Sequence, residues 1–514
     1  MRFMAICLHE FHKRCEAPGM VVAQTRTGWP GGGRAGIFDS GKNGMGAVGR
    51  GRRSLSYAVL PCRPAHRGTR VTRNISRQRA SNLFMANLIS RIPLSLCAMA
   101  LVLSAGSVKT DPAKKSGETK PANSEDWTVW GGKNRDFIVN STGLADSWPA
   151  GGPKKLWSRP LGDGYSAIAV EGGVLYTAFR RGSKDVITAL DAATGKTRWE
   201  YEYENPFTNS FSEKVGPGPY AMPQVVGDRV VTASGTGKIH SLDKKTGRPV
   251  WSHDLYSEFG GTQMQFGYSC HGLPYKDTLI YLSGGSGAGA IAIRQSDGAV
   301  VWKALQFTNS HSSPLLIQVD GQQQVVALAA NTVFGFSPDN GTLLWTHEHK
   351  TPYGLAVSTP VWAPGNLLFV ASAYSTGARV LQLSQSGGKT TVKELWYEPR
   401  LQLHIGTAIQ RDGYIYLSSG YDGPVFMTAV ELKTGKVLWR DRQFAKAQLL
   451  YADGKIILAD QDGTLALCKV SPQKFEVLSK APVLESISWT PPTLAGTRLY
   501  VRDRKTIEAF DLAR

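Results

Sequence analysis

Residues 189–201 read ALDAATGKTRWEY, and the chain repeats variants of this phrase. Residues 240–252 read HSLDKKTGRPVWS, and IRQSDGAVVWK, FSPDNGTLLWT and VELKTGKVLWR follow further along. Each version contains a short strand pattern, a polar turn with Gly, a second strand pattern and a Trp at its end. The Gly supplies the positive φ that a tight hairpin turn requires. Such self-similarity indicates a repeat architecture, and the repeat decides the fold prediction.

The repeat-ending Trp recurs every 42 to 52 residues. A further pair of apolar strand patterns precedes each phrase, as in GGVLYTAF, GDRVVTAS and DGYIYLSS. Each unit therefore has four short strands, which is typical of a propeller blade. We expect the Trp residues to pack between neighbouring blades, where a buried aromatic side chain contributes roughly 2–3 kcal/mol. They are Trp157, Trp199, Trp251, Trp302, Trp345, Trp396 and Trp439.

Two units depart from the pattern. The seventh has Ser479 where the Trp would stand, and the last, which contains Trp489, ends the chain after three strands. The segment GGPKKLWSRPL at 151–161 is expected to supply the missing fourth strand, which would remove the open sheet edge. The sequence therefore predicts an all-β, eight-bladed β-propeller over residues 126–514, closed by an N-terminal strand.

The first 125 residues have the pattern of an export signal with flanking sequence and not the pattern of a folded domain. Most of the net charge of +19 lies in residues 1–84, which lack the interleaved aromatic residues of a nucleic-acid-binding arm. Residues 85–107 have the layout of a secretory signal peptide, with an apolar run too short for a comfortable membrane span. We interpret residues 1–84 as untranslated sequence upstream of a start at Met85, or as a disordered basic leader, and residues 108–125 as a linker.

This interpretation places the mature protein in the periplasm or outside the cell. No nucleic-acid partner and no stable membrane insertion after signal cleavage are expected. Cys97 follows Leu96 rather than a small residue, so lipid anchoring is not expected. Cys270 and Cys468 stand in distant repeats and are predicted to be buried thiols rather than a disulfide, and no CxxCH haem motif is present.

The phrase A-x-D-x-x-T-G-x-x-x-W, nearly whole at 189–199, resembles the tryptophan-docking signature of pyrroloquinoline-quinone (PQQ) repeats. The stretch DWTVWGGKNRDFIVNSTGLADSWPAGGPKKLW likewise resembles the start of secreted PQQ-like propellers. This resemblance covers roughly residues 126–514. It implies the propeller fold and leaves the function open, because one fold hosts many activities.

Two kinds of relative in this superfamily imply different functions. Quinoprotein alcohol dehydrogenases bind PQQ with Ca²⁺ held by carboxylate and amide oxygens, and they carry an Asp general base and a disulfide between adjacent cysteines. This sequence has no adjacent Cys pair. The BamB-like propeller lipoprotein of the outer-membrane β-barrel assembly machinery instead binds proteins without a cofactor.

A candidate site follows from aligning the blades at the start of their innermost strands, in segments such as YSAIAV, HSSPLL and WTPPTL. The first positions should converge on one face of the central channel. Their aromatic, His and Lys side chains suit a planar or anionic ligand, or alternatively they cap the channel with water and bond loop backbones. A His pair without a carboxylate is weak evidence for zinc, so no metal is expected. These ring residues are Tyr165, Tyr220, His271, His311, Val357, Ile405 with His404 beside it, Lys446 and Trp489.

The long connections at 203–219 and 256–269 contain Phe, Tyr and Met. They are either binding surfaces or decoration packed on the propeller. The leading functional hypothesis is a monomeric binding or scaffold module that holds a protein or polymer on its face or loops, with no cofactor. The alternative is a PQQ-dependent alcohol dehydrogenase-like oxidoreductase that uses PQQ with calcium.

Overall fold

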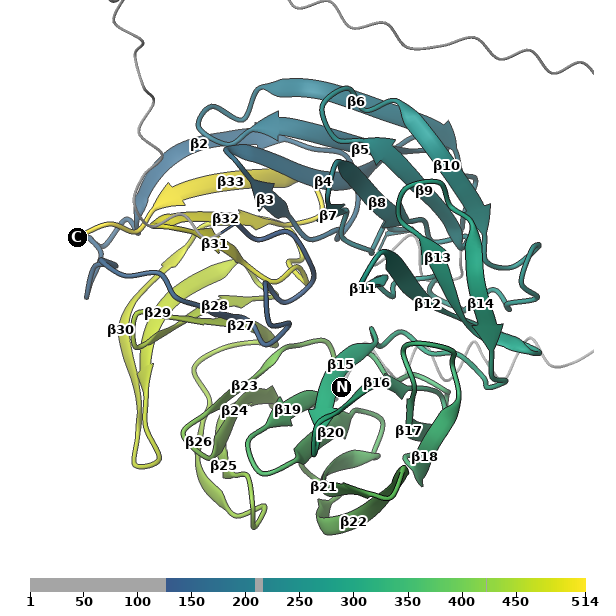
Figure 1. Ribbon diagram of the computed structural model, residues 1–514. Helices are drawn as coiled ribbons and strands as arrows, with labels where there is room; N and C mark the ends of the chain where they lie inside the picture. Colours follow the sequence, from purple (N-terminus) through teal and green to yellow (C-terminus); the bar gives the residue numbers. More distant parts are fainter. Residues whose placement is uncertain (1–125, 209–215, 422) are drawn as a thin grey trace, which may run out of the picture. The chain divides into compact units, whose positions relative to one another are not determined.

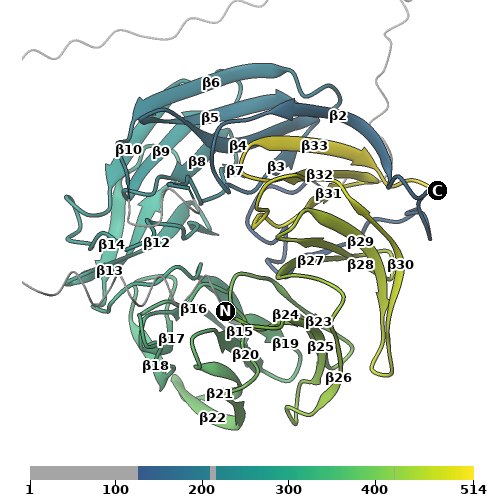
Figure 2. The ribbon, with the colours of Figure 1, turned by 180° about the vertical axis from the view of Figure 1, so that it is seen from behind.

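The computed structural model describes residues 126–208, 216–421 and 423–514. In this part of the chain the strands form eight small sheets arranged in a ring, seen from one side in Figure 1 and from behind in Figure 2. The described residues contain no helix, and so none that could cross a membrane. The predicted eight-bladed β-propeller is confirmed. Our interpretations of residues 1–84, 85–107 and 108–125 concern residues outside the described part.

Blades 1 to 7 each contain a four-stranded antiparallel meander that runs from the innermost strand, near the channel, to the outermost strand (Figure 1). Blade 1 comprises β3 (Ala169–Glu171), β4 (Val174–Arg181), β5 (Lys184–Asp191) and β6 (Thr197–Glu204). Blade 2 comprises β7 (Gln224–Val226), β8 (Arg229–Ala233), β9 (Lys238–Asp243) and β10 (Pro249–Asp254), and blade 3 comprises β11 (Leu273–Tyr275), β12 (Thr278–Gly285), β13 (Ala288–Arg294) and β14 (Val300–Ala304). Blade 4 comprises β15 (Leu315–Val319), β16 (Gln322–Leu328), β17 (Thr332–Phe336) and β18 (Leu343–Glu348). Blade 5 comprises β19 (Val361–Ala363), β20 (Leu367–Ser372), β21 (Gly377–Ser386) and β22 (Lys389–Glu398). Blade 6 comprises β23 (Ala408–Arg411), β24 (Tyr414–Ser419), β25 (Phe426–Glu431) and β26 (Val437–Asp441). Blade 7 comprises β27 (Ala447–Ala452), β28 (Lys455–Asp460), β29 (Thr464–Val470) and β30 (Phe475–Pro482).

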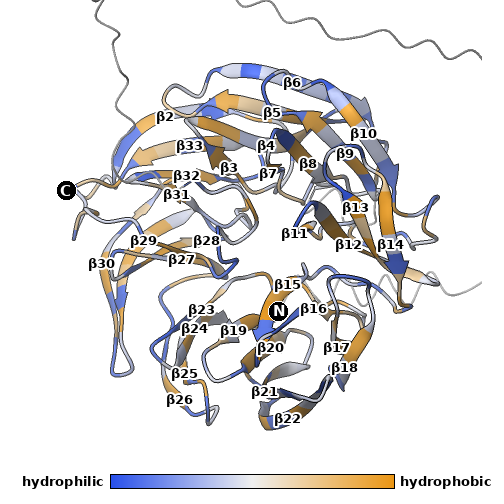
Figure 3. Cartoon of the chain, viewed as in Figure 1, coloured by the Kyte–Doolittle hydropathy of each residue, from blue (hydrophilic) through white to orange (hydrophobic). Residues whose placement is uncertain are grey.

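The middle strands of a blade are covered by other blades on both faces, and the outer strand is not. In blade 1, β4 and β5 are buried along almost their whole length, whereas β6 alternates between exposed and half-buried residues. Figure 3 shows the corresponding hydrophilic residues along outer strands such as β6 and β30. This difference explains why the middle strands read as continuous apolar runs and the outer strands as alternating ones.

Blade 8 closes the ring as the sequence predicted. It comprises β31 (Thr493–Ala495), β32 (Arg498–Arg502) and β33 (Thr506–Asp511), completed by the N-terminal strand β2 (Lys154–Pro160). β2 pairs antiparallel with β33, with Trp157 opposite Ala509. The fully buried Arg502 strengthens the seam to blade 1, because its guanidinium donates to the carbonyl oxygens of Gly164, Ser166 and Ala178 among others.

Six of the seven repeat-ending Trp residues donate an indole N–H to a backbone carbonyl in the hairpin turn of the next blade. Trp157 donates to Ala192 O at 3.1 Å, and Trp199 donates to Lys244 O at 3.0 Å. The turn glycine lies against the indole face, so that a Cβ on Gly195 would approach the Trp157 ring to 2.8 Å. The Gly is therefore required by this contact as well as by its positive φ. The same bond is made by Trp251, Trp302, Trp396 and Trp439.

Trp345 is the exception. It donates at 2.7 Å to Oε1 of Gln324 in its own blade. The next blade has longer third and fourth strands, β21 and β22, and their Gly387–Gly388 turn lies further from the paired Trp396 than the corresponding turn lies in other blades. Only Trp251 and Trp345 among the seven are buried, and the others are half-buried because the outer strands lie at the rim of the propeller.

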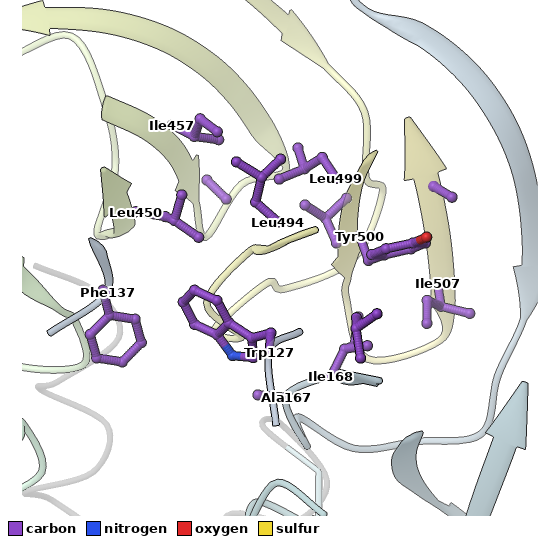
Figure 4. Packing of buried hydrophobic residues seen from close by; sticks show 14 of the residues in the cluster. Trp127, Phe137, Ala167, Ile168, Leu450, Ile457, Leu494, Leu499, Tyr500 and Ile507 are labelled. Atoms are coloured by element: carbon purple, nitrogen blue, oxygen red, sulfur yellow. The ribbon is translucent and has the colours of Figure 1, made fainter. Parts of the chain in front are cut away.

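A feature that the sequence did not predict is a segment that crosses the channel. Residues 126–139, called here the plug segment, end in β1 (Ile138–Val139), which pairs parallel with β27 of blade 7. Trp127 bridges to Val170 in blade 1, and the Val225 N–H of blade 2 donates to Thr128 O. Figure 4 shows Trp127 and Phe137 of this segment packed among core residues of blades 1, 7 and 8. The plug segment thus joins blades that are distant in the sequence.

Candidate functional site

A cavity of about 470 Å³ lies in the central channel. The ring residues precede the innermost strands, whereas the plug segment pairs with residues within those strands. The two ends of the plug segment therefore lie deeper in the channel than the ring residues, and its middle forms the floor of the cavity. The floor is contributed by Trp130 and residues 134–137. The walls and the mouth come from side chains of most of the blades.

The structure brings almost all of the sequence-predicted ring residues to this cavity. Those that line it are Tyr165, Tyr220, His271, His311, Val357, His404, Ile405 and Trp489. Lys446 does not line the cavity. Its Nζ lies 5.7 Å from the centre of the Tyr421 ring, and its charge acts on the neighbouring His404.

The ring residues stand at different distances in sequence from the inner strands, and the inner strands themselves differ in length. Tyr165, Tyr220, His311, Val357 and Trp489 each stand four residues before their inner strand. Ile405 stands three residues before it, His271 two and Lys446 one.

Two groups of aromatic side chains flank the cavity. The aromatic ring of Tyr165 is stacked between those of Tyr220 and Trp489, with 6.0 Å and 5.0 Å between the ring centroids. In the other group the Tyr374 hydroxyl lies 2.9 Å from His404 Nε2, and Tyr421 packs against both rings. Stacked and edge-on rings hold one another in place, so they present fixed apolar surfaces to a ligand.

The lining histidines are neutral. Burial lowers the pKa of His271 to about 3, assisted by the charge of Arg135, and burial lowers the pKa of His311 to about 4. Burial also lowers the pKa of His404 to about 3, with a smaller contribution from Lys446. At neutral pH these imidazoles therefore act as hydrogen-bonding groups and not as cations.

The contacts of His271 assign its tautomer. Its Nε2 accepts a hydrogen bond of 2.9 Å from the backbone N–H of Met222, so the ring proton lies on Nδ1. Nδ1 donates to Ser313 Oγ at 2.7 Å, and the His271 backbone N–H donates to the same oxygen at 3.1 Å. Ser313 Oγ is thus an acceptor twice, and its own hydroxyl proton stays available to another acceptor.

Sequence analysis missed the residues of the floor. Trp130 stacks on His271 with a ring distance of 4.3 Å, and its indole N–H donates to Thr359 Oγ1 at 3.1 Å. Arg135 is 8% exposed and donates to Gly272 O at 3.0 Å and to Pro314 O at 3.4 Å. The one local signal was the Gly131–Gly132 pair, which turns the plug segment back on itself.

The described parts of both long connections pack on the propeller. In 203–219, Asn205 and Phe207 are buried and their carbonyl oxygens accept from Arg180, while residues 209–215 lie outside the described part. In 256–269, Phe259 and Tyr268 are buried, and Phe266 reaches the cavity wall. The second connection is therefore both packed decoration and part of the candidate site.

Comparison with known proteins places the chain among PQQ-repeat propellers. It is 25% identical over 326 residues to the outer membrane protein assembly factor BamB of Yersinia pestis, covering 62% of this chain and 68% of the relative. It is 24% identical over 318 residues to a polyvinylalcohol dehydrogenase of Pseudomonas sp., covering 56% of this chain. The match spans 47%, about half, of that relative's length.

Solved structures of both kinds share the fold. BamB from Moraxella catarrhalis matches 70% of this chain and 100% of its own, with a TM-score of 0.50 and 18% identity. The quinohemoprotein alcohol dehydrogenase from Comamonas testosteroni matches 75% of this chain and 80% of its own, with a TM-score of 0.53 and 12% identity. The family model described as outer membrane protein assembly factor BamB matches residues 148–254 and 183–441. Since these matches together cover more than half of the 514 residues, the chain belongs to this family of PQQ-repeat propellers.

Proposed function

We propose that this chain is an exported binding or scaffold module whose ligand occupies the central cavity. The observation that carries the proposal is the cavity itself. Its volume of about 470 Å³ and its largely apolar and aromatic lining, with a few polar groups converging from several blades, are typical of ligand-binding sites. The ligand is a small molecule, or one end of a protein or polymer that rests on the same face of the propeller.

The proposed location is the periplasm or the outside of the cell. Relatives named as outer membrane protein assembly factors support it, as does the signal-peptide pattern of residues 85–107. We further propose that the protein acts as a monomer, because strand β2 completes blade 8 and leaves no blade a strand short.

A quinoprotein function has support from the similarity to polyvinylalcohol dehydrogenases, but the cavity does not fit a PQQ–calcium centre. Asp136 is the only carboxylate among the lining residues. No group of three His, Cys, Asp or Glu residues in the described part is placed to hold a metal ion. Cys270 and Cys468 are separate buried thiols, as the sequence predicted. Quinone absorbance and dye reduction after reconstitution with PQQ and Ca²⁺ would reverse this judgement.

The experiment is native mass spectrometry of the protein purified from its own cells, compared with variants of the ring. Trp489→Ala and Tyr165→Ala should lose a co-purified ligand, because they remove one stacked wall of the cavity. Tyr397→Ala is the matched control, since Tyr397 is an exposed aromatic on outer strand β22. A ligand retained in both ring variants would place binding elsewhere and overturn the proposal.

A further inference from the structure

Arg135 places a positive charge in the cavity without a negative partner. Its guanidinium is nearly buried, and its two hydrogen bonds, to Gly272 O and Pro314 O, use two of its five N–H groups. It forms no ion pair within 4.0 Å with any described residue. Burial lowers its pKa to about 10, so the group stays charged at neutral pH.

A buried cation without a counter-charge is costly unless other groups satisfy all of its donors. Arg502 in the same chain is a buried cation whose donors are satisfied by protein groups. Its guanidinium is fully buried in the seam between blades 8 and 1 and donates to five oxygens: four backbone carbonyls and the hydroxyl of Thr177. Arg502 does not line the cavity, whereas Arg135 does and keeps unused donors there.

A second donor lines the same cavity as Arg135. The carbonyls that bind Arg135 belong to Gly272 and Pro314, the residues that follow His271 and Ser313. Ser313 Oγ accepts twice from His271 and still has a hydroxyl proton to donate. Two donors, one of them charged, thus line the cavity from adjoining segments of the chain, and a carboxylate is the group that accepts from such a pair best.

We propose that the cavity takes a ligand with a planar, apolar body and a carboxylate, and that the carboxylate binds Arg135 and the hydroxyl of Ser313. The body lies against Trp130, Phe266 and other apolar lining residues. This inference rests on the proposed function, because it assumes that the cavity is the binding site.

Asp136 is the one lining carboxylate, and it opposes an anionic ligand. Its Oδ1 accepts from the Ile138 N–H at 3.1 Å, and it makes no ion pair with Arg135. Burial raises the pKa of Asp136 above its usual range, which weakens the repulsion. Removing this charge should therefore strengthen carboxylate binding. The Asp136→Asn variant thus tests the inference by an expected increase in affinity.

The experiment titrates the full chain by calorimetry with two probes of the same shape, biphenyl-4-carboxylate and biphenyl-4-carboxamide. The carboxylate should bind about tenfold tighter or more, because its bond to Arg135 is charge-assisted. Arg135→Gln should bring the ratio close to one while changing carboxamide affinity by less than about threefold. Arg135→Lys should retain part of the preference, and Asp136→Asn should increase it.

Each outcome decides a separate question. Equal affinity for both probes leaves the cavity as a binding site and overturns the carboxylate inference. Binding of neither probe also overturns the inference, whereas the proposed function is then judged by the co-purified ligand. If Arg135→Gln unfolds, seen as a lost cooperative thermal transition, Asp136→Asn decides, since an unchanged probe ratio in that folded variant contradicts the inference.

Discussion

Gly195 provides a test of how Trp157 fastens the closed ring. Gly195 has a φ of +71°, and a Cβ there would lie 2.8 to 2.9 Å from the nearest atoms of the Trp157 indole. Carbon atoms in ordinary contact are about 3.5–4.0 Å apart. In Gly195→Ala the indole must therefore retreat by roughly 0.7 Å, and this movement weakens its 3.1 Å bond to Ala192 O.

Two costs add in Gly195→Ala. An Ala in the left-handed conformation costs about 1–2 kcal/mol. Partial loss of indole packing and of the Ala192 hydrogen bond costs about 1–2 kcal/mol more. The free energy of unfolding should fall by about 2–4 kcal/mol in total. Trp157→Ala alone should cost about 2–4 kcal/mol, below the roughly 3–5 kcal/mol of a buried Trp, because this side chain is half-buried.

The assay is a double-mutant cycle measured by urea unfolding with far-ultraviolet circular dichroism. In the Trp157→Ala background the new methyl meets no indole, so Gly195→Ala should cost only the backbone part. A coupling of about 1–2 kcal/mol is expected. Gly182→Ala is the control, because Gly182 has a φ of +63° and open space around its Cβ position. Additive costs at Gly195 would refute the idea that the turn glycine exists to receive the indole.

Three further outcomes are expected. Asp185→Ala removes the carboxylate that lies 2.8 Å from buried Arg180, so the free energy of unfolding in urea should fall by about 3–5 kcal/mol. Arg181→Ala breaks only exposed ion pairs and should lower it by less than about 1 kcal/mol, and equal losses in the two variants would contradict the role of burial. Burial lowers the pKa of His349 to about 3, so below pH ~6.5 the unfolded chain binds the proton first and the free energy of unfolding falls as the pH drops. His349→Gln should reduce the dependence of this free energy on pH by up to ~1.4 kcal/mol per pH unit. An unchanged profile of urea midpoint against pH in the variant would show that His349 titrates normally. Deletion of residues 126–161 removes β2 and leaves blade 8 with an open edge, so aggregation is expected in size-exclusion chromatography, and a monomeric, cooperatively folded deletion protein would mean that the ring closes in another way.

The repeated phrase was sufficient to predict the fold, the number of blades and the closing strand. Its information is local, because the turn Gly, the strand pattern and the Trp lie within about a dozen residues and recur. The same period also placed Tyr165, Tyr220, His311 and Trp489 on one ring, since equivalent positions of successive blades must face the same channel. It also placed His271 there, whereas Lys446 does not line the cavity.

Only the tertiary structure revealed the floor of the cavity and its charge. Residues 126–139 have no strand or helix periodicity, and their partners in blades 1 to 5 and 7 lie as far as 313 residues away, from Ile138 to Tyr451. No local pattern encodes such contacts. Whether Arg135 is a solvated surface cation or an unpaired cavity donor depends on which carbonyls it meets, and those belong to Gly272 and Pro314. The sequence by itself determined the ring, because every blade repeats the same local chemistry, and the structure decided the site, because the plug segment crosses the channel only once.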